Sequence, residues 1–125
     1  MKDGKFVILC IDDDKDYLYS LRMILEANDY IMEEALSAEE GLRVYKAADP
    51  DFIIVDLMME SIEAGKNFVK ELRLLANKAP VYMLSSVGDA LASNIDVTEL
   101  GLQGVFQKPI EPNTLLKTLR TKLKK

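Results

Sequence analysis

Residues 52–59 read FIIVDLMM, an apolar run that leads directly into the carboxylate of Asp56. A short, continuous apolar run rich in β-branched residues is typical of a strand buried on both faces, as in a parallel sheet. In open parallel sheets, ligands bind beyond the carboxyl ends of the strands, where the strand order reverses. Asp56 is therefore the leading candidate for a functional residue.

Four more segments have the character of short strands, and helical patterns separate them. Strands are predicted at 6–11, which is a buried apolar run, and at 81–84. The segment 30–35 is predicted as a short, weaker strand, and 104–107 as a short fifth strand. Helices are predicted at 16–28, at 37–48 where a Ser-x-x-Glu capping box begins the helix, and from Pro112 onward. A further helix is predicted after a loop at 61–65, with Phe68, Leu72 and Leu75 facing inward. A late or broken helix is predicted within 87–101. This alternation predicts an α/β fold, with a five-stranded parallel sheet between helices, as a single domain over residues 1–125.

Composition narrows the class of protein. The chain has 125 residues, of which 49% are hydrophobic and 30% are charged, as in a globular domain. No apolar run reaches membrane-spanning length and no signal peptide is recognisable, so a cytoplasmic location is expected. The single cysteine, Cys10, lies within an apolar run and is predicted to be a buried, inert thiol. The net charge of −5 argues against nonspecific binding of nucleic acid.

Polar residues follow four of the predicted strands. Asp12 and Asp13 follow the first strand, Asp56 the third, Ser85 the fourth and Lys108 the fifth. Parallel strands end at the same edge of a sheet, so these side chains should share one rim. Three carboxylates there would repel one another unless a cation lay among them, and oxygen ligands favour Mg²⁺. A hydroxyl and an ammonium beside that ion suit a phosphoryl group, with Asp56 as the nucleophile.

The segments IDD (11–13), VDLMM (55–59), LSS (84–86) and KP (108–109) together resemble the receiver domain of two-component response regulators. The resemblance covers essentially the whole chain. It implies a flavodoxin-like, doubly wound (βα)5 fold with strand order 2-1-3-4-5. It also implies that a histidine kinase or a histidine phosphotransfer protein donates a phosphoryl group to Asp56 in a Mg²⁺-dependent reaction.

The same resemblance assigns roles to the residues of the rim. Asp13 is implied to bind Mg²⁺ directly and Asp12 partly through water, with Asp56 and the backbone carbonyl of Met58 as the other protein ligands. Ser85 and Lys108 are implied to hold the phosphoryl oxygens, and the Lys108–Pro109 peptide bond is implied to be cis.

The chain departs from the family pattern at the position of the switch aromatic. Val105 stands three residues before Lys108, where the family has an aromatic residue, and Phe106 is expected to belong to the core. We therefore hypothesise that phosphorylation shifts the 85–106 surface, and the 87–101 segment in particular, without an aromatic rotamer change.

Residues beside the site bear on how long the phosphoryl group would last. Receivers often orient the hydrolytic water with side chains two residues after the aspartate and two after the hydroxyl. Met58 and Val87 stand there in this chain, and neither can orient water. The protein is therefore expected to catalyse its own phosphorylation and a slow dephosphorylation, while acting mainly as a signalling switch.

Three alternatives and the partners complete the predictions. A pseudo-receiver would use the fold only as a protein-protein interaction module, and the presence of every expected acid argues against it. A Mg²⁺-dependent phosphatase would need an acid in place of Met58, and a flavin site would be repelled by Asp12, Asp13 and Asp14. Expected partners are the phosphodonor, an output domain or partner protein, and a second copy in a homodimer. Neither nucleic acid nor a membrane is expected to bind directly.

Overall fold

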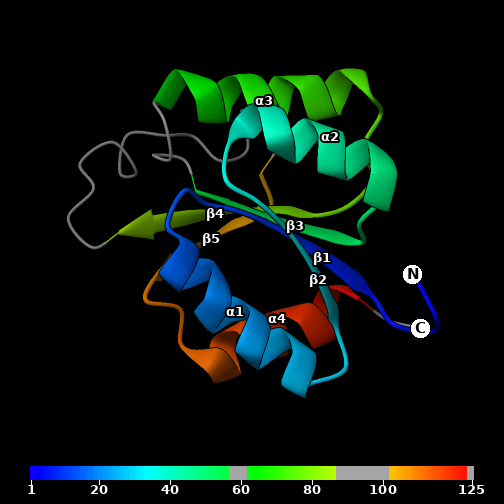
Figure 1. Ribbon diagram of the computed structural model, residues 1–125, viewed down its shortest axis with the longest axis vertical. Coiled ribbons are helices and arrows are strands. Elements are labelled where there is room, and N and C mark those ends of the chain that lie inside the picture. Colours follow the sequence, from blue (N-terminus) through cyan, green and yellow to red (C-terminus); the bar gives the residue numbers. More distant parts are fainter. Residues whose placement is uncertain (57–61, 87–101, 124–125) are drawn as a thin grey trace.

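A five-stranded sheet lies between two layers of helices in the computed structural model, which describes residues 1–56, 62–86 and 102–123 (Figure 1). The strands are all parallel, and their order β2-β1-β3-β4-β5 confirms the prediction. The predicted helix within 87–101 lies outside the described residues. The elements, in chain order, are β1 (Val7–Ile11), α1 (Lys15–Ala27), β2 (Ile31–Ala35), α2 (Ala38–Ala48), β3 (Phe52–Asp56), α3 (Ile62–Leu74), β4 (Val81–Ser86), β5 (Gly104–Lys108) and α4 (Pro112–Lys122).

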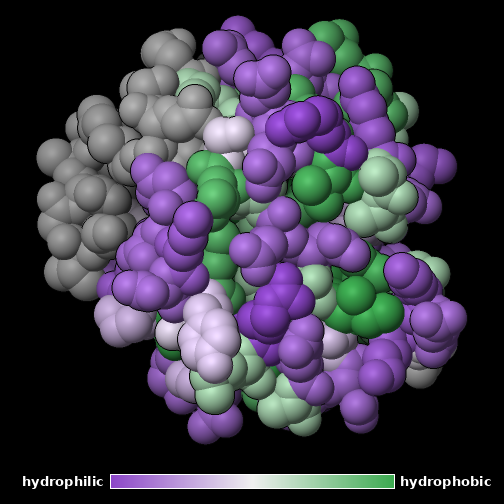
Figure 2. All heavy atoms as spheres, viewed as in Figure 1, coloured by the Kyte–Doolittle hydropathy of each residue, from purple (hydrophilic) through white to green (hydrophobic). Residues whose placement is uncertain are grey.

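The two faces of the sheet carry separate hydrophobic cores. Alternate residues of a strand point to opposite faces, so Ile8, Cys10 and Ile54 pack with α1 and α4, whereas Leu9 and Ile53 pack with α2 and α3. Figure 1 shows the same pairing of helices below and above the sheet. Every residue of β1 and β3 is buried, which is why their sequences are continuous apolar runs. Hydrophilic residues dominate the face of the molecule shown in Figure 2.

The helix starts follow the capping signals in the sequence. Ser37 caps α2, because its hydroxyl accepts a hydrogen bond from the Glu40 backbone N–H at 3.1 Å. The Glu40 carboxylate in turn accepts from the Leu36 backbone N–H, one residue before the cap. Pro112 occupies the first turn of α4, as predicted, behind the capping carboxylate of Glu111. No helix in the described part of the chain is both long and apolar enough to cross a membrane.

Two expectations for α3 were wrong. The helix begins at Ile62, so the loop predicted at 61–65 is helical from its second residue onward. Leu75, predicted to face inward, is 41% exposed, and Val69 is buried instead. The helix ends at Leu74, and the chain then turns away through Ala76, whose φ is +57°. Leu75 therefore never reaches the buried face that the helical spacing would have given it.

Two buried residues of the sheet match their predictions. Cys10 is fully buried in β1, and this burial raises the pKa of its thiol. Phe106 is 4% exposed and stacks on Tyr82 at 4.9 Å between ring centroids, and Tyr82 stacks on Phe52 at 5.0 Å. Val105, on the opposite face of β5, is 41% exposed. The aromatic side chain of β5 thus belongs to the core, as expected.

Helix α2 lies unusually close to β1 at Gly41. A Cβ atom at this position would stand 2.7 Å from Cδ1 of Ile11, a side chain that is completely buried. The absence of a side chain at Gly41 therefore lets α2 pack closely on β1.

Candidate functional site

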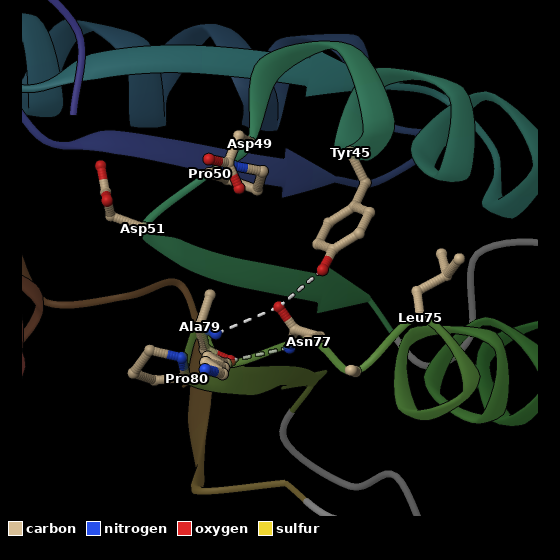
Figure 3. Close-up of a pocket in the computed structure, with 10 residues that line it drawn as sticks. Tyr45, Asp49, Pro50, Asp51, Leu75, Asn77, Ala79 and Pro80 are labelled. Atoms are coloured by element: carbon tan, nitrogen blue, oxygen red, sulfur yellow. Dashed lines mark hydrogen bonds between the residues drawn. The ribbon is translucent and has the colours of Figure 1, made fainter.

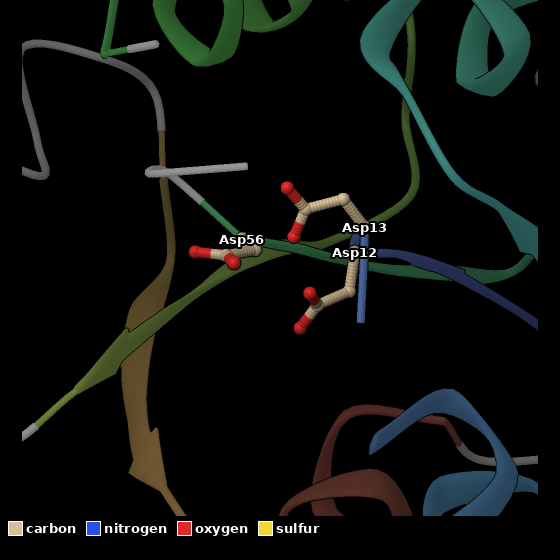
Figure 4. A group of neighbouring side chains, drawn as sticks. All are labelled: Asp12, Asp13 and Asp56. Carbon is tan, nitrogen blue, oxygen red and sulfur yellow. The ribbon is translucent and has the colours of Figure 1, made fainter. Parts of the chain in front are cut away.

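Three carboxylates meet at the carboxyl ends of β1 and β3 (Figure 4). Asp12 and Asp13 follow β1, and Asp56 is the last residue of β3. Because β1 and β3 are neighbours in the sheet, one oxygen of each side chain lies within 4.8 Å of the other two. Asp12 is fully buried, Asp56 is 8% exposed and Asp13 is exposed. The arrangement offers oxygen ligands of the type that a hard cation prefers.

The two oxygens of Asp12 are in different environments. Oδ1 accepts a hydrogen bond from the Asp14 backbone N–H at 3.0 Å. Oδ2 is buried and has no partner in hydrogen-bond geometry among the described residues, and its contact with Lys108 Nζ at 2.7 Å is an ion pair. A buried carboxylate oxygen with acceptor capacity to spare is what a bound cation would satisfy. The residues present thus fit a metal ion.

Lys108, the last residue of β5, connects that strand to the acids. Its Nζ also donates a hydrogen bond to Oδ2 of Asp56 at 3.2 Å. Burial on its own lowers the pKa of Lys108, but the close contacts with the negatively charged Asp12 and Asp56 outweigh it, so the pKa lies above its ordinary value. The side chain is therefore a fixed positive charge at neutral pH. The predicted cis peptide bond between Lys108 and Pro109 is present.

The structure brings Asp12, Asp13, Asp56 and Lys108 together, and it places Ser85 on the same rim. Ser85 is 3% exposed near the end of β4. In the pairing of β3 with β4, Asp56 stands opposite Leu84, so Ser85 is one residue further along the neighbouring strand. Met58 lies outside the described residues.

The sequence did not single out Tyr17, which also reaches this site from the first turn of α1. Its ring lies under the Lys108 ammonium, with Nζ 4.7 Å from the ring centroid. Its hydroxyl accepts a hydrogen bond from the Ile110 backbone N–H at 3.2 Å. An aromatic residue in an amphipathic helix gives no sequence signal of such a contact, because the contact depends on how α1 packs beside the loop after β5.

A separate cleft of about 430 Å³ lies at the amino ends of β3 and β4 (Figure 3). The Asn77 side chain lies within it and accepts hydrogen bonds from the Tyr45 hydroxyl and the Ala79 backbone N–H, both at 3.1 Å. Its amide nitrogen donates to the Ala79 carbonyl at 2.9 Å. These bonds join α2 to the turn before β4, so we interpret the cleft as structural. The candidate site remains the rim at the carboxyl ends.

Comparison with known proteins is consistent with this geometry. The family model described as "Response regulator receiver domain" matches residues 8–120. Among curated proteins, the chain is 31% identical over 129 residues to "Probable transcriptional regulator ycf27" of Cyanophora paradoxa, covering 100% of this chain and 51% of that protein. It is 28% identical over 118 residues to "Response regulator MprA" of Mycolicibacterium vanbaalenii, covering 94% and 50%. The chain thus spans about half the length of these relatives.

Two solved response regulators match this chain over nearly their whole length. The chemotaxis response regulator CheY4 of Vibrio cholerae superposes with a TM-score of 0.83 at 29% identity, covering 96% of this chain and 100% of that one. A putative response regulator from Chloroflexus aurantiacus also has a TM-score of 0.83, at 28% identity, covering 94% and 97%.

Proposed function

The chain belongs to the response regulator receiver domain family, and we propose that it accepts a phosphoryl group on Asp56 from a histidine kinase or a histidine phosphotransfer protein. The observation that carries the proposal is the shared contact of Lys108 with Asp12 and Asp56, with Asp13 beside them. An acceptor carboxylate, a fixed positive charge and two further acids at one rim suit phosphoryl transfer.

In the proposed reaction, a carboxylate oxygen of Asp56 attacks the phosphorus atom of the donor phosphohistidine. The O–P bond forms as the N–P bond breaks, and the imidazole nitrogen keeps the electron pair and takes up a proton. Lys108 stabilises the negative charge on the phosphoryl oxygens, and Ser85 would donate a hydrogen bond to one of them. The product is an acyl phosphate on Asp56.

Receiver domains bind Mg²⁺ at an acidic pocket, and the acids at this rim fit that ion. Asp12, Asp13 and Asp56 would hold it, with the backbone carbonyl of Met58 as a further ligand. When bound, Mg²⁺ would neutralise charge on the transferred phosphoryl group. In the absence of a metal ion, the Lys108 ammonium contacts both Asp12 and Asp56 and offsets the repulsion between their carboxylates.

The output of the switch is proposed to involve the 85–106 surface. Phe106 is buried in the core and stacks on Tyr82, so a shift of backbone rather than of an aromatic ring would carry the signal. The relatives that it matches are about twice as long, and one of them is named a transcriptional regulator. We propose that the domain signals to an output domain, to a partner protein or through a second copy in a homodimer.

Incubation with acetyl phosphate and Mg²⁺, followed by intact mass measurement, tests the proposal. The native chain should gain the mass of one phosphoryl group, and Asp56→Asn should gain none. Asp16→Asn, which removes an exposed carboxylate of α1, is the matched control and should react like the native chain. Equal labelling of the native chain and Asp56→Asn would reject Asp56 as the acceptor. A native chain that takes no label, from this donor or from a phosphorylated kinase, would support the pseudo-receiver alternative.

A further inference from the structure

The aromatic side chain of Tyr17 holds the loop after β5 at two points. Its ring faces the Lys108 ammonium at 4.7 Å, and its hydroxyl accepts from the Ile110 backbone N–H at 3.2 Å. The helix start fixes the Tyr17 backbone in turn, because the Asp14 carboxylate caps α1 and accepts from the Tyr17 N–H at 3.2 Å. Tyr17 is therefore a rigid support rather than a loose surface side chain.

Contacts of Lys108 connect the segment that follows β1 to the end of β5, although these two strands are not neighbours in the sheet. In the sheet, β3 and β4 separate β1 from β5. Asp12 contacts Lys108 through its Oδ2 atom, and its Oδ1 atom accepts a hydrogen bond from the backbone N–H of Asp14. The Asp14 carboxylate in turn accepts from the Tyr17 backbone N–H. The segment 12–17 thus contacts Lys108 through a carboxylate and through an aromatic ring.

Phosphorylation would affect the contacts of the Lys108 ammonium in different ways. Among the described residues, its ammonium contacts Asp12, Asp56 and the Tyr17 ring. In the proposed function, Asp12 serves as a metal ligand and Asp56 becomes an acyl phosphate, so both carboxylates are engaged elsewhere. The ring takes part in neither event. Cation–π attraction to a half-buried aromatic ring is thus the one described contact that the reaction leaves in place.

We propose that Tyr17 is a positioning residue for Lys108, whose ring keeps the ammonium directed at the phosphoryl group while the carboxylates exchange partners. The proposal rests on the proposed function of the site. A leucine at this position would fill much of the same space but would offer no π face to the ammonium. A phenylalanine would keep the ring and would lose only the hydrogen bond from Ile110.

Rates of phosphorylation by acetyl phosphate with saturating Mg²⁺ test this role, because a small donor avoids any contact between α1 and a partner protein. Tyr17→Leu should react about five-fold more slowly than the native chain, and Tyr17→Phe should stay within about two-fold of it. Tyr30→Leu is the matched control, since Tyr30 packs on the same hydrophobic core and has no contact with Lys108. It should lose stability and keep the native rate.

A second measurement reports the position of Lys108 without any turnover. The ring current of Tyr17 should shift the NMR signals of the Lys108 side-chain methylene groups upfield in the native chain and in Tyr17→Phe, and not in Tyr17→Leu. The shift should persist when Mg²⁺ and beryllofluoride, an unreactive phosphoryl analogue, are added.

Several results would overturn the proposal. They are a native rate for Tyr17→Leu, an equal loss of rate in Tyr30→Leu or in Tyr17→Phe, and Lys108 signals that do not differ between Tyr17→Leu and the native chain. If the native chain itself takes no label, the proposed function fails and the role of Tyr17 fails with it. If the native chain reacts and Tyr17→Leu reacts equally fast, only the role of Tyr17 is lost.

Discussion

Replacing Lys108 with methionine should destabilise the metal-free protein by about 3 kcal/mol. Methionine keeps an unbranched apolar stem of similar length but removes the charge that contacts Asp12 at 2.7 Å and Asp56 at 3.2 Å. Leaving a buried charge unpaired costs about 3–5 kcal/mol. Asp12 is completely buried, whereas the Lys108 side chain is 19% exposed, so the lower end of that range applies.

Urea denaturation in the presence of a chelator measures this loss, and repeating it with Mg²⁺ tests the cause. A cation among the acids would take over the role of the missing ammonium. Mg²⁺ should therefore raise the free energy of unfolding more in Lys108→Met than in the native chain. A ligand at one hundred times its Kd contributes about 2.7 kcal/mol, which is large enough to resolve.

Lys117→Met is the matched control, because Lys117 is an exposed residue of α4. It changes the net charge equally and should alter neither the stability nor the effect of Mg²⁺. The reasoning is refuted if the metal-free Lys108→Met protein is as stable as the native chain, or if Mg²⁺ stabilises both to the same extent.

Two further predictions concern positions away from the site. Gly41→Ala should lower the free energy of unfolding, measured by urea denaturation. A Cβ atom at 2.7 Å from the buried Ile11 side chain costs about 1–3 kcal/mol of overpacking, which exceeds the gain of about 0.5–1 kcal/mol from helix propensity. A more stable variant would show that α2 can move outward freely. Hydrogen bonds from the backbone N–H groups of Asn113 and Thr114 lower the pKa of Glu111 in the folded protein. The ionised carboxylate therefore stabilises α4 at pH values above the unfolded-state pKa. This stabilisation is lost as the pH falls through the folded-state pKa. Glu111→Ala should accordingly be less stable than the native chain at pH 7, and the difference should shrink as the pH falls below 4.5, whereas a pH-independent difference would contradict the capping role.

The strands β1 and β3 could be predicted from the sequence because burial on both faces requires a continuous apolar run. These runs located Asp12 and Asp56, since Asp12 follows β1 and Asp56 ends β3 at the same edge of the sheet, and Lys108 ends the less apolar strand β5. The start of α3 could not be predicted, because the segment 61–65 contains a glycine and has no apolar stripe of its own. Packing of Phe68 and its neighbours on the sheet overrides that weak local preference.

The end of α3 and the role of Tyr17 were also invisible in the sequence. The turn after the helix depends on the positive φ of Ala76, a residue type that does not announce such a backbone conformation. The contact of Tyr17 with Lys108 requires the packing of α1 beside the loop after β5, and no local pattern encodes it. Residue spacing thus identifies which side chains reach the rim from strand ends, and it does not identify those that arrive from a helix.

The burial of Cys10 gives the chain a built-in reporter of its own opening. It is the single thiol of the sequence, and it is completely buried within β1 with its pKa raised by that burial. An alkylating reagent can reach it only when β1 separates from the helices that cover it. The rate of thiol modification under native conditions therefore measures how often those separations occur in the native sequence, with no residue replaced.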